Sequence, residues 1–373
     1  MSKDSTVTMT TTHPDRLAGL LLGTAVGDAL GLPSEGLRPA TIRRLGWNGN
    51  WRHRFFAGKG MWSDDTEHTI MIAQALLGAQ GDPRCFVRSF AWELRWWILG
   101  LPAGVGLATA RGILKLWLGF PPWRSGVFSA GNGPCMRAAV VGAFHASDRK
   151  LRYDFTAAHT KSTHLDPKAL TAALAVADMA ALLCQSQQPP GLETILDTLR
   201  QRESDPDWLR IIDALEMSLL SNAQLAEFQE RIGNEPDRGV SGYAYHTVPV
   251  VLFLGINNDW NFRATLTQVL DAGGDADSTG AIAGALCGAF GGREAIPDDW
   301  VTGIAEWPTT TRSLASLADS LVTGQPTRIR PRWSPLLLIR NLFFLTVVLA
   351  HALLRLFPAS WRCQGSTPAT ASP

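Results

Sequence analysis

The stretch that decides the fold is residues 16–36, RLAGLLLGTAVGDALGLPSEG. Its glycines recur at every fourth position: Gly19, Gly23, Gly27 and Gly31. Residues four apart share one face of an α-helix, so the spacing predicts a helix over residues 15–32 with a groove along one side. A second backbone can approach such a face closely.

A second stretch, residues 278–290, carries the same stripe at Gly280, Gly284 and Gly288. Stripes of small residues also occur in membrane helices. Here, however, carboxylates lie on or beside the striped segments, including Asp28, and ionised side chains are costly in lipid. We therefore expect two closely packed helices inside a water-soluble bundle.

The rest of the body shows helical spacing of apolar residues and few runs with strand alternation. Further helices are predicted over residues 66–77, 83–99, 107–118, 135–146, 167–183, 192–202, 208–220, 222–232, 248–254 and 262–270. The sequence thus predicts an all-α fold, with one compact multi-helix domain over residues 14–323. The polar segments 1–13 and 358–373 are expected to be disordered.

Composition excludes several classes of protein. Lys and Arg number 34 against 33 Asp and Glu, for a net charge of +1, which argues against a dedicated nucleic-acid binder. Hydrophobic residues make up 46% of the chain, too many for a disordered protein. The five cysteines form no paired or CxxC pattern, and residues 1–13 lack the apolar core of a signal peptide. These features favour a cytoplasmic location.

Two acidic clusters stand at predicted helix starts. The first is Ser63-Asp64-Asp65-Thr66-Glu67, and the second runs over residues 271–280, DAGGDADSTG. Each alone is explained by helix capping, because Ser and Asp bind free N–H groups and acids oppose the helix dipole. Together the clusters offer hydroxyl and carboxylate oxygens suited to hard divalent cations: Ser63, Asp64, Asp65, Asp275, Asp277 and Ser278.

Two loops have an ordinary and a functional interpretation. Residues 131–134, GNGP, either form a simple turn or present backbone N–H groups to a phosphate at a helix start. In residues 163–167, THLDP, the last two are typical of a helix N-terminus. Nothing of that kind explains His164.

The order of these segments resembles the ADP-ribosylglycohydrolase family, which includes the dinitrogenase-reductase-activating glycohydrolase. The similarity extends over about residues 16–292. It rests on seven segments in the family's order: GLLLGTAVGDALGLPSEG, GMWSDDTEHTIMIAQAL, LPAGVGLATARGI, GNGPCMRAAVVG, HTKSTHLDPKAL, GYAYHTVPVVLFL and GGDADSTGAIAGALCGAFGG.

The resemblance implies an all-α hydrolase with a binuclear Mg²⁺ site, or Mn²⁺ in some members. It places the metal ligands at Ser63, Asp64, Asp65, Asp275, Asp277 and Ser278. The candidate catalytic carboxylates are Glu35, Asp65 and Asp275. The residues implied to bind ADP-ribose are Ser129, Gly131, Asn132, Gly133, His164 and Tyr243, with Tyr245 as a rival for the aromatic that stacks on adenine.

The expected activity is Mg²⁺-dependent cleavage of the bond that joins ADP-ribose to a protein side chain. Two alternatives stay open. The chain either acts on a non-protein ADP-ribose conjugate, or it is catalytically silent and binds ADP-ribose or a toxin. The two intact acidic clusters argue against a silent protein.

The C-terminal region differs from the body in composition. Residues 324–335 are predicted to be a linker, because prolines interrupt a helix and the arginines are dense for a core. Residues 336–357 form an apolar helix long enough to cross a bilayer, although Arg340 and Arg355 lie within it. Attachment to the inner face of a membrane is expected here. The alternative is a helix docked on the catalytic domain.

Overall fold

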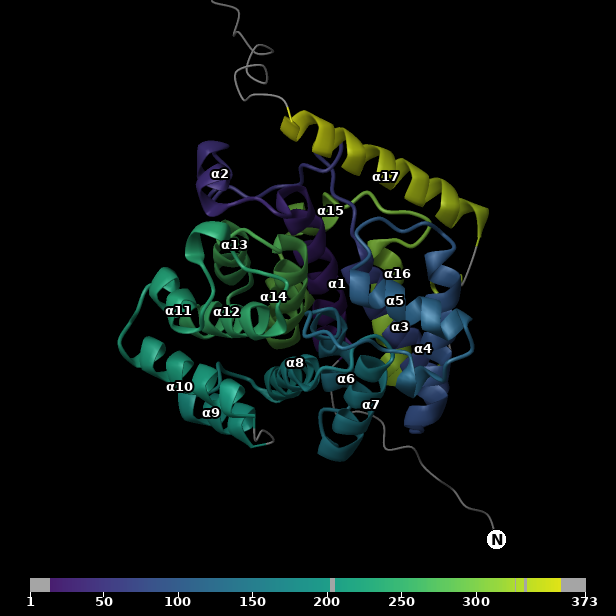
Figure 1. Cartoon of the computed structure of the whole chain (residues 1–373), viewed down its shortest axis with the longest axis horizontal. Coiled ribbons are helices and arrows are strands. Elements are labelled where there is room, and N and C mark those ends of the chain that lie inside the picture. Colours follow the sequence, from purple (N-terminus) through teal and green to yellow (C-terminus); the bar gives the residue numbers. More distant parts are fainter. Residues whose placement is uncertain (1–13, 202–204, 326, 332–333, 357–373) are drawn as a thin grey trace, which may run out of the picture.

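A computed structural model describes residues 14–201, 205–325, 327–331 and 334–356. The predicted disordered segments 1–13 and 358–373 lie outside this part of the chain. The fold is all-α, as predicted (Figure 1), and in the described part β-pairing is limited to isolated bridges. The helices are α1 Pro14–Gly31, α2 Pro39–Arg44, α3 Asp64–Ala79, α4 Pro83–Ile98, α5 Leu107–Trp117, α6 Ala139–Phe144, α7 Arg149–Lys161, α8 Pro167–Gln185, α9 Leu192–Arg200, α10 Pro206–Leu220, α11 Leu225–Arg231, α12 Ala244–Asn257, α13 Phe262–Asp271, α14 Ala276–Gly291, α15 Asp298–Thr302, α16 Thr311–Thr323 and α17 Pro335–Leu356.

The two glycine-striped helices, α1 and α14, pack against each other at the centre of the molecule (Figure 1). A Cβ on Gly27 would lie 1.9 Å from the carbonyl oxygen of Gly280, and one on Gly23 would lie 2.1 Å from that of Gly284. The partners run in opposite directions along the two helices, so the pair is antiparallel. Only glycine allows this approach, and the predicted close packing is confirmed.

The other helices surround this pair. Helices α3, α6 and α16 pack on α1, while α8, α12 and α13 pack on α14. Most of the buried apolar side chains form one large core that joins these layers, and a smaller cluster lies under α17. Because the pair is antiparallel, the C-terminus of α1 lies beside the N-terminus of α14. The loop that follows α1 and the loop that precedes α14 both carry acidic residues.

The predicted helices form within a few residues of their expected ends. One difference is residues 135–146, which start as a 3₁₀ turn over Cys135–Arg137 before α6. Helices α2, α7, α15 and α16 were not predicted individually. Helix α7, RKLRYDFTAAHTK, is mostly polar, and its apolar stripe is too short to stand out in the sequence.

Helix α17 docks along the outside of the body (Figure 1). Its inner face packs Phe344 against Phe55, with ring centroids 4.7 Å apart. In the part of the chain that the structure describes, three helices are long and apolar enough to cross a membrane by length and composition: α1 with the turn that follows it, α8 and α17. The apolar windows of the first two are 94% and 78% buried in the fold. The α17 window is only 28% buried, so its outer face is open to a further contact.

The described part of the predicted linker also packs on the body. Arg328 forms an ion pair with Glu93 at 2.6 Å, and the backbone N–H of Ile329 donates to Gln74 Oε1 at 3.0 Å. Arg330 is 2% exposed. Of the arginines that suggested a linker, Arg328 and Arg330 instead pair with the buried Glu93 of α4 and Glu67 of α3.

Candidate active site

The first acidic cluster is held in place by a buried carboxylate of α1. Asp28 is fully buried and accepts hydrogen bonds from the Ser63 backbone N–H at 2.9 Å and the Thr66 hydroxyl at 2.6 Å. Ser63 caps α3, with its hydroxyl accepting from the Asp65 N–H. The α1 carboxylate therefore fixes the turn from which Asp64 and Asp65 project.

The second cluster follows a tight turn at Gly273 and Gly274, whose φ angles are +62° and +82°. Gly274 accepts a hydrogen bond from the Gly36 N–H at 2.7 Å, and its own N–H donates to the Leu37 carbonyl at 2.8 Å. A Cβ on Gly274 would lie 2.0 Å from the Val240 carbonyl oxygen. This turn places the loop that follows Glu35 beside the start of α14.

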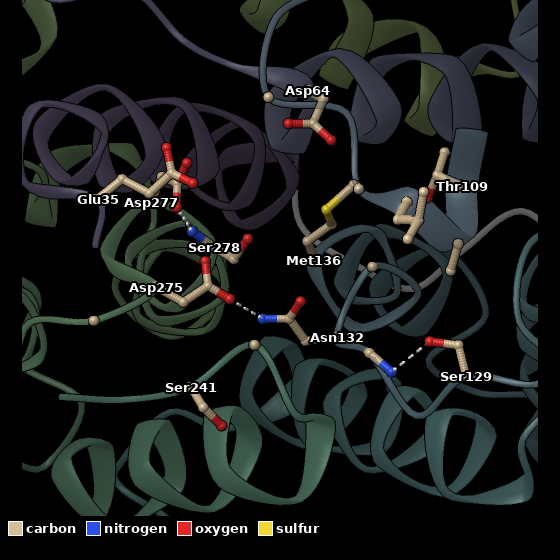
Figure 2. Close-up of a pocket in the computed structure, with 18 of the residues that line it drawn as sticks. Glu35, Asp64, Thr109, Ser129, Asn132, Met136, Ser241, Asp275, Asp277 and Ser278 are labelled. Carbon is tan, nitrogen blue, oxygen red and sulfur yellow. Dashed lines mark hydrogen bonds between the residues drawn. The ribbon is translucent and has the colours of Figure 1, made fainter. Parts of the chain in front are cut away.

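These loops surround a cavity of about 520 Å³ (Figure 2). Ten of the predicted site residues line it: Glu35, Asp64, Ser129, Gly131, Asn132, Gly133, His164, Asp275, Asp277 and Ser278. Ser63 and Asp65, which flank Asp64 in the chain, are buried and are joined by a 3.0 Å hydrogen bond. The cavity size is in the range that encloses small-molecule ligands.

Asn132 connects the loop of residues 131–134 to the second acidic cluster. Its Nδ2 donates to Asp275 Oδ2 at 2.7 Å and to the Thr247 hydroxyl at 3.0 Å (Figure 2). Its backbone N–H donates to the Gly242 carbonyl at 3.0 Å. The side-chain amide of Asn132 thus orients the Asp275 carboxylate as well as lining the cavity.

The carboxylates raise one another's pKa values. Burial, and then the charge of Asp28, raise the pKa of Asp64 and of Asp65 well above the usual range. Burial, followed by the charges of Glu35 and Asp65, does the same for Asp277. Burial raises the pKa of Asp28 to about 6, although its hydrogen bonds oppose this. Such mutual repulsion favours a bound cation.

The donor set fits a hard divalent cation such as Mg²⁺ or Mn²⁺. All the predicted ligands offer oxygen atoms, and Asp65 Oδ1 is buried without a hydrogen-bond partner. Within the described residues, no three His, Cys, Asp or Glu side chains are close enough to hold one ion together. Binding would therefore require the acidic side chains to draw together.

His164 lies at the other end of the cavity, with Nε2 facing the loop of Gly131. A Cβ on Gly131 would lie 3.2 Å from Nε2. Arg137 Nη2 donates to the Thr163 hydroxyl at 2.6 Å, and that hydroxyl lies 2.9 Å from His164 Nδ1. The hydroxyl accepts from Arg137 and keeps its own proton to donate; donation to Nδ1 corresponds to the tautomer with the ring proton on Nε2.

His164 is also held neutral. Burial, and then the nearby Arg137 charge, lower the pKa of His164 to about 3. A neutral ring with its proton on Nε2 presents one hydrogen-bond donor to the cavity. An anionic ligand oxygen is the natural acceptor for it.

The two tyrosines have different positions. Tyr245 is 1% exposed, and its hydroxyl donates to Asp205 at 2.7 Å, so it belongs to the core. Tyr243 is half-buried beside the cavity, adjacent to the lining residue Gly242, and its ring packs on His246 with centroids 4.9 Å apart. Tyr243 is thus the better placed of the two for contact with a bound base.

Sequence reasoning missed several residues of this site. Asp28 had a signal, because a carboxylate in an otherwise apolar, glycine-striped helix needs buried donors. Thr109, Met136 and Ser241 also line the cavity, yet no local pattern marks them. They reach it only through the packing of loops that are distant in the sequence.

Comparison with known proteins agrees with this arrangement. The family model described as ADP-ribosylglycohydrolase matches residues 9–330. The chain belongs to the ADP-ribosylglycohydrolase family. The match confirms the predicted membership. The family is a class of enzymes that hydrolyse ADP-ribose linkages.

Relatives and a solved structure cover most of the chain. An uncharacterized protein of Archaeoglobus fulgidus is 31% identical, over 78% of this chain and 92% of its own. The ADP-ribosyl-[dinitrogen reductase] glycohydrolase of Rhodospirillum rubrum is 28% identical, over 77% and 90%. A solved ADP-ribosylglycohydrolase-related protein complex aligns with a TM-score of 0.61 at 25% identity, covering 83% of this chain and 98% of that one.

Proposed function

We propose that this family member is a Mg²⁺-dependent hydrolase that removes ADP-ribose from a modified protein side chain. The observation that carries the proposal is one cavity with two different ends. Glu35, Asp275 and Asp277 gather on one side, while Ser129 lies on the other, in the loop whose Gly131 faces His164 Nε2 (Figure 2). A ribose diol suits the acidic end, and a diphosphate suits the donor end.

The metal ligands in this proposal are Ser63, Asp64, Asp65, Asp275, Asp277 and Ser278. A divalent cation there would supply Lewis acidity, which lowers the pKa of water and orients hydroxyl groups. Asp28 keeps the first ligand loop in place, and Asn132 keeps Asp275 turned toward the cavity. These two residues orient the ligands.

Glu35 is the proposed proton-transferring group. It lines the cavity, is exposed to solvent and lies outside both acidic clusters. Its charge acts on Asp277, which places the two carboxylates near each other. A carboxylate at this position can take a proton from water or give one to the leaving group while the ribosyl carbon develops positive charge.

Substrate class is tested by a panel of defined conjugates: ADP-ribosyl-arginine protein, ADP-ribosyl-serine protein, ADP-ribosylated nucleic acid and O-acetyl-ADP-ribose. The relative from Rhodospirillum rubrum is named for a protein substrate. We expect Mg²⁺-dependent release of ADP-ribose from a protein conjugate. Release from non-protein conjugates alone would show that the substrate is not an ADP-ribosylated protein. Tight ADP-ribose binding without any release would favour a silent binding protein.

We also propose a cytoplasmic protein whose α17 lies on the inner membrane surface without spanning it. Support comes from its exposed apolar residues: Leu336, Ile339, Leu342, Leu349 and Leu353. Spanning would break the buried contacts of Arg340 and Asn341. Flotation with phosphatidylglycerol-containing vesicles tests this. Full-length protein should float, and Ile339→Glu/Leu342→Glu should not; wild-type protein that stays unbound would contradict membrane attachment.

A further inference from the structure

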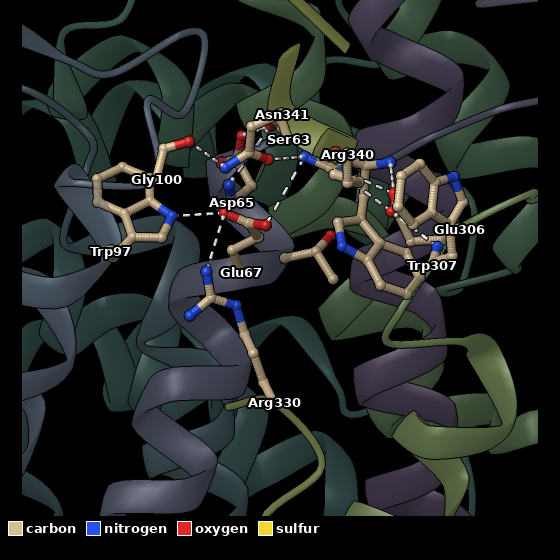
Figure 3. Close-up of polar contacts among 12 residues, drawn as sticks. Ser63, Asp65, Glu67, Trp97, Gly100, Glu306, Trp307, Arg330, Arg340 and Asn341 are labelled. Atoms are coloured by element: carbon tan, nitrogen blue, oxygen red, sulfur yellow. Dashed lines mark hydrogen bonds and ion pairs between the residues drawn. The ribbon is translucent and has the colours of Figure 1, made fainter. Parts of the chain in front are cut away.

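Helix α17 inserts a buried arginine beside the first metal-ligand loop (Figure 3). Arg340 is 3% exposed, and its Nε and Nη2 donate to the two carboxylate oxygens of Glu306 at 2.8 and 2.7 Å. Nη1 lies 3.7 Å from Glu67 in the first turn of α3. A two-point contact of this kind fixes the guanidinium in one orientation.

The Arg340–Glu306 ion pair binds both the backbone carbonyl and the backbone N–H of Trp62. Arg340 Nη2 donates to the Trp62 carbonyl at 2.6 Å, while the Trp62 N–H donates to Glu306 Oε2 at 3.3 Å. The next residue, Ser63, has its N–H on Asp28. The backbone that enters α3 is therefore tied from two sides, by α1 and by α17, immediately before Asp64.

The segment that matches the family model ends at residue 330, so Arg340 lies beyond it. Glu67 and Glu306 lie within it, and both are buried. A buried carboxylate needs a cationic partner. Glu67 also lies 3.7 Å from Arg330, which is inside the matching segment, whereas the guanidinium that binds Glu306 at two points comes from the C-terminal helix.

We propose that Arg340 is a positioning residue for the metal-ligand loop, and that α17 is a functional part of the catalytic body. The inference rests on the proposed metal site, because its consequence is the placement of Ser63, Asp64 and Asp65. Within the described residues, the polar contacts of Arg340 are with Glu306, Trp62, Asn341 and Glu67, and none of these lines the cavity. Arg340 acts through the Trp62 backbone.

The test uses the full chain with three substitutions. Arg340→Met removes every donor, and Arg340→Lys keeps the charge. Val347→Ala is the matched control, since Val347 is buried on the docked face of α17 and has no polar contact with the loop. Hydrogen–deuterium exchange of peptides covering residues 61–67 reports loop order, and calorimetry with Mn²⁺ reports metal affinity.

We expect Arg340→Met to speed exchange in residues 61–67 and to weaken Mn²⁺ binding about tenfold or more, as for other groups that orient metal ligands. Arg340→Lys should recover part of both effects, and Val347→Ala should change neither. Unchanged exchange and affinity in Arg340→Met, or equal effects of Val347→Ala, would overturn the proposal. If the wild-type chain binds no Mn²⁺, the proposed metal site is wrong. The exchange rates of residues 61–67 would then still decide whether Arg340 orders the loop.

Discussion

Asp28 and Ser63 are 35 residues apart in the sequence, yet both Asp28 carboxylate oxygens lie 2.9 Å from the Ser63 backbone nitrogen. This contact connects the glycine-striped core to the acidic loop. Because α1 is locked to α14 by its glycines, the charge that positions the first ligand loop is fixed relative to the second. The packing of the core therefore determines the relative position of the two acidic loops.

Replacing Asp28 with Asn should loosen the loop. The amide keeps the size of the side chain but turns an NH₂ group toward the donors of Ser63 or Thr66. Lost hydrogen bonds to a charged group cost about 1.5–3 kcal/mol, so urea unfolding should show a loss of this order. Mn²⁺ affinity should fall too. Thr24→Ala, a buried polar change on α1 whose hydroxyl bonds only within its helix, is the control; equal Mn²⁺ affinity in both variants would refute the role of Asp28.

The stability of the metal-free protein should depend on pH through the acidic cluster. The raised pKa values of Asp64, Asp65 and Asp277 mean that the folded state binds more protons than the unfolded state. Their contribution to stability therefore falls as pH rises above about 4, through the Asp28 pKa of about 6 and beyond. A bound cation reverses this loss.

Melting temperatures measured in EDTA and in excess Mg²⁺ check this directly. Mg²⁺ should raise the melting temperature more at pH 8 than at pH 5, because protons compete with the ion for the same oxygens. Comparing the two conditions at each pH removes the contribution of groups outside the site. A Mg²⁺ shift of the same size at both pH values would count against the cluster.

The glycine contact predicts two opposite effects of the same substitution. Gly27→Ala would place a Cβ 1.9 Å from a backbone carbonyl of α14, so the helices must separate; a loss of about 3 kcal/mol or more is expected, at the upper end for overpacking. Gly78→Ala, in an exposed part of α3 with open space around it, should stabilise the protein by about 0.5–1 kcal/mol. Chemical denaturation of both variants measures the difference, and similar effects would contradict the packing.

The Arg137–Thr163–His164 chain makes a prediction about the ring proton. Thr163→Val removes the hydroxyl that contacts His164 Nδ1 and can donate to it, whereas Thr163→Ser keeps it. We expect weaker ADP-ribose binding in the valine variant alone, with Mn²⁺ affinity unchanged in both. Nitrogen-15 NMR of labelled histidine should show Nε2–H in the wild type; an Nδ1–H signal there would contradict the assignment.

Much of this fold could be predicted because the decisive signals are local. The four-residue glycine spacing, and the Asp166-Pro167 start of α8 with its cap on the Lys168 N–H, each depend on neighbouring residues. The acidic clusters were likewise visible as short motifs. Their convergence in one cavity was implied only by the family resemblance, because it depends on the antiparallel register of α1 and α14, which no local motif shows.

The C-terminal region shows where sequence reasoning reaches its limit. Residues 336–357 look like a membrane segment, since length and hydropathy do not reveal which residues have buried partners. Arg340 and Arg330 count as obstacles or as linker charges in the sequence, yet each faces a buried carboxylate far away in the chain. Such pairs become visible only in three dimensions.

The most direct test of the account is release of ADP-ribose from an ADP-ribosylated protein by the wild type, Asp64→Asn and Asp277→Asn, each in Mg²⁺ and in EDTA. The wild type should release ADP-ribose in Mg²⁺ only, and neither folded variant should release it. Circular dichroism should show the same helical content in all three. Full wild-type activity in EDTA, or undiminished activity in the two variants, would contradict it.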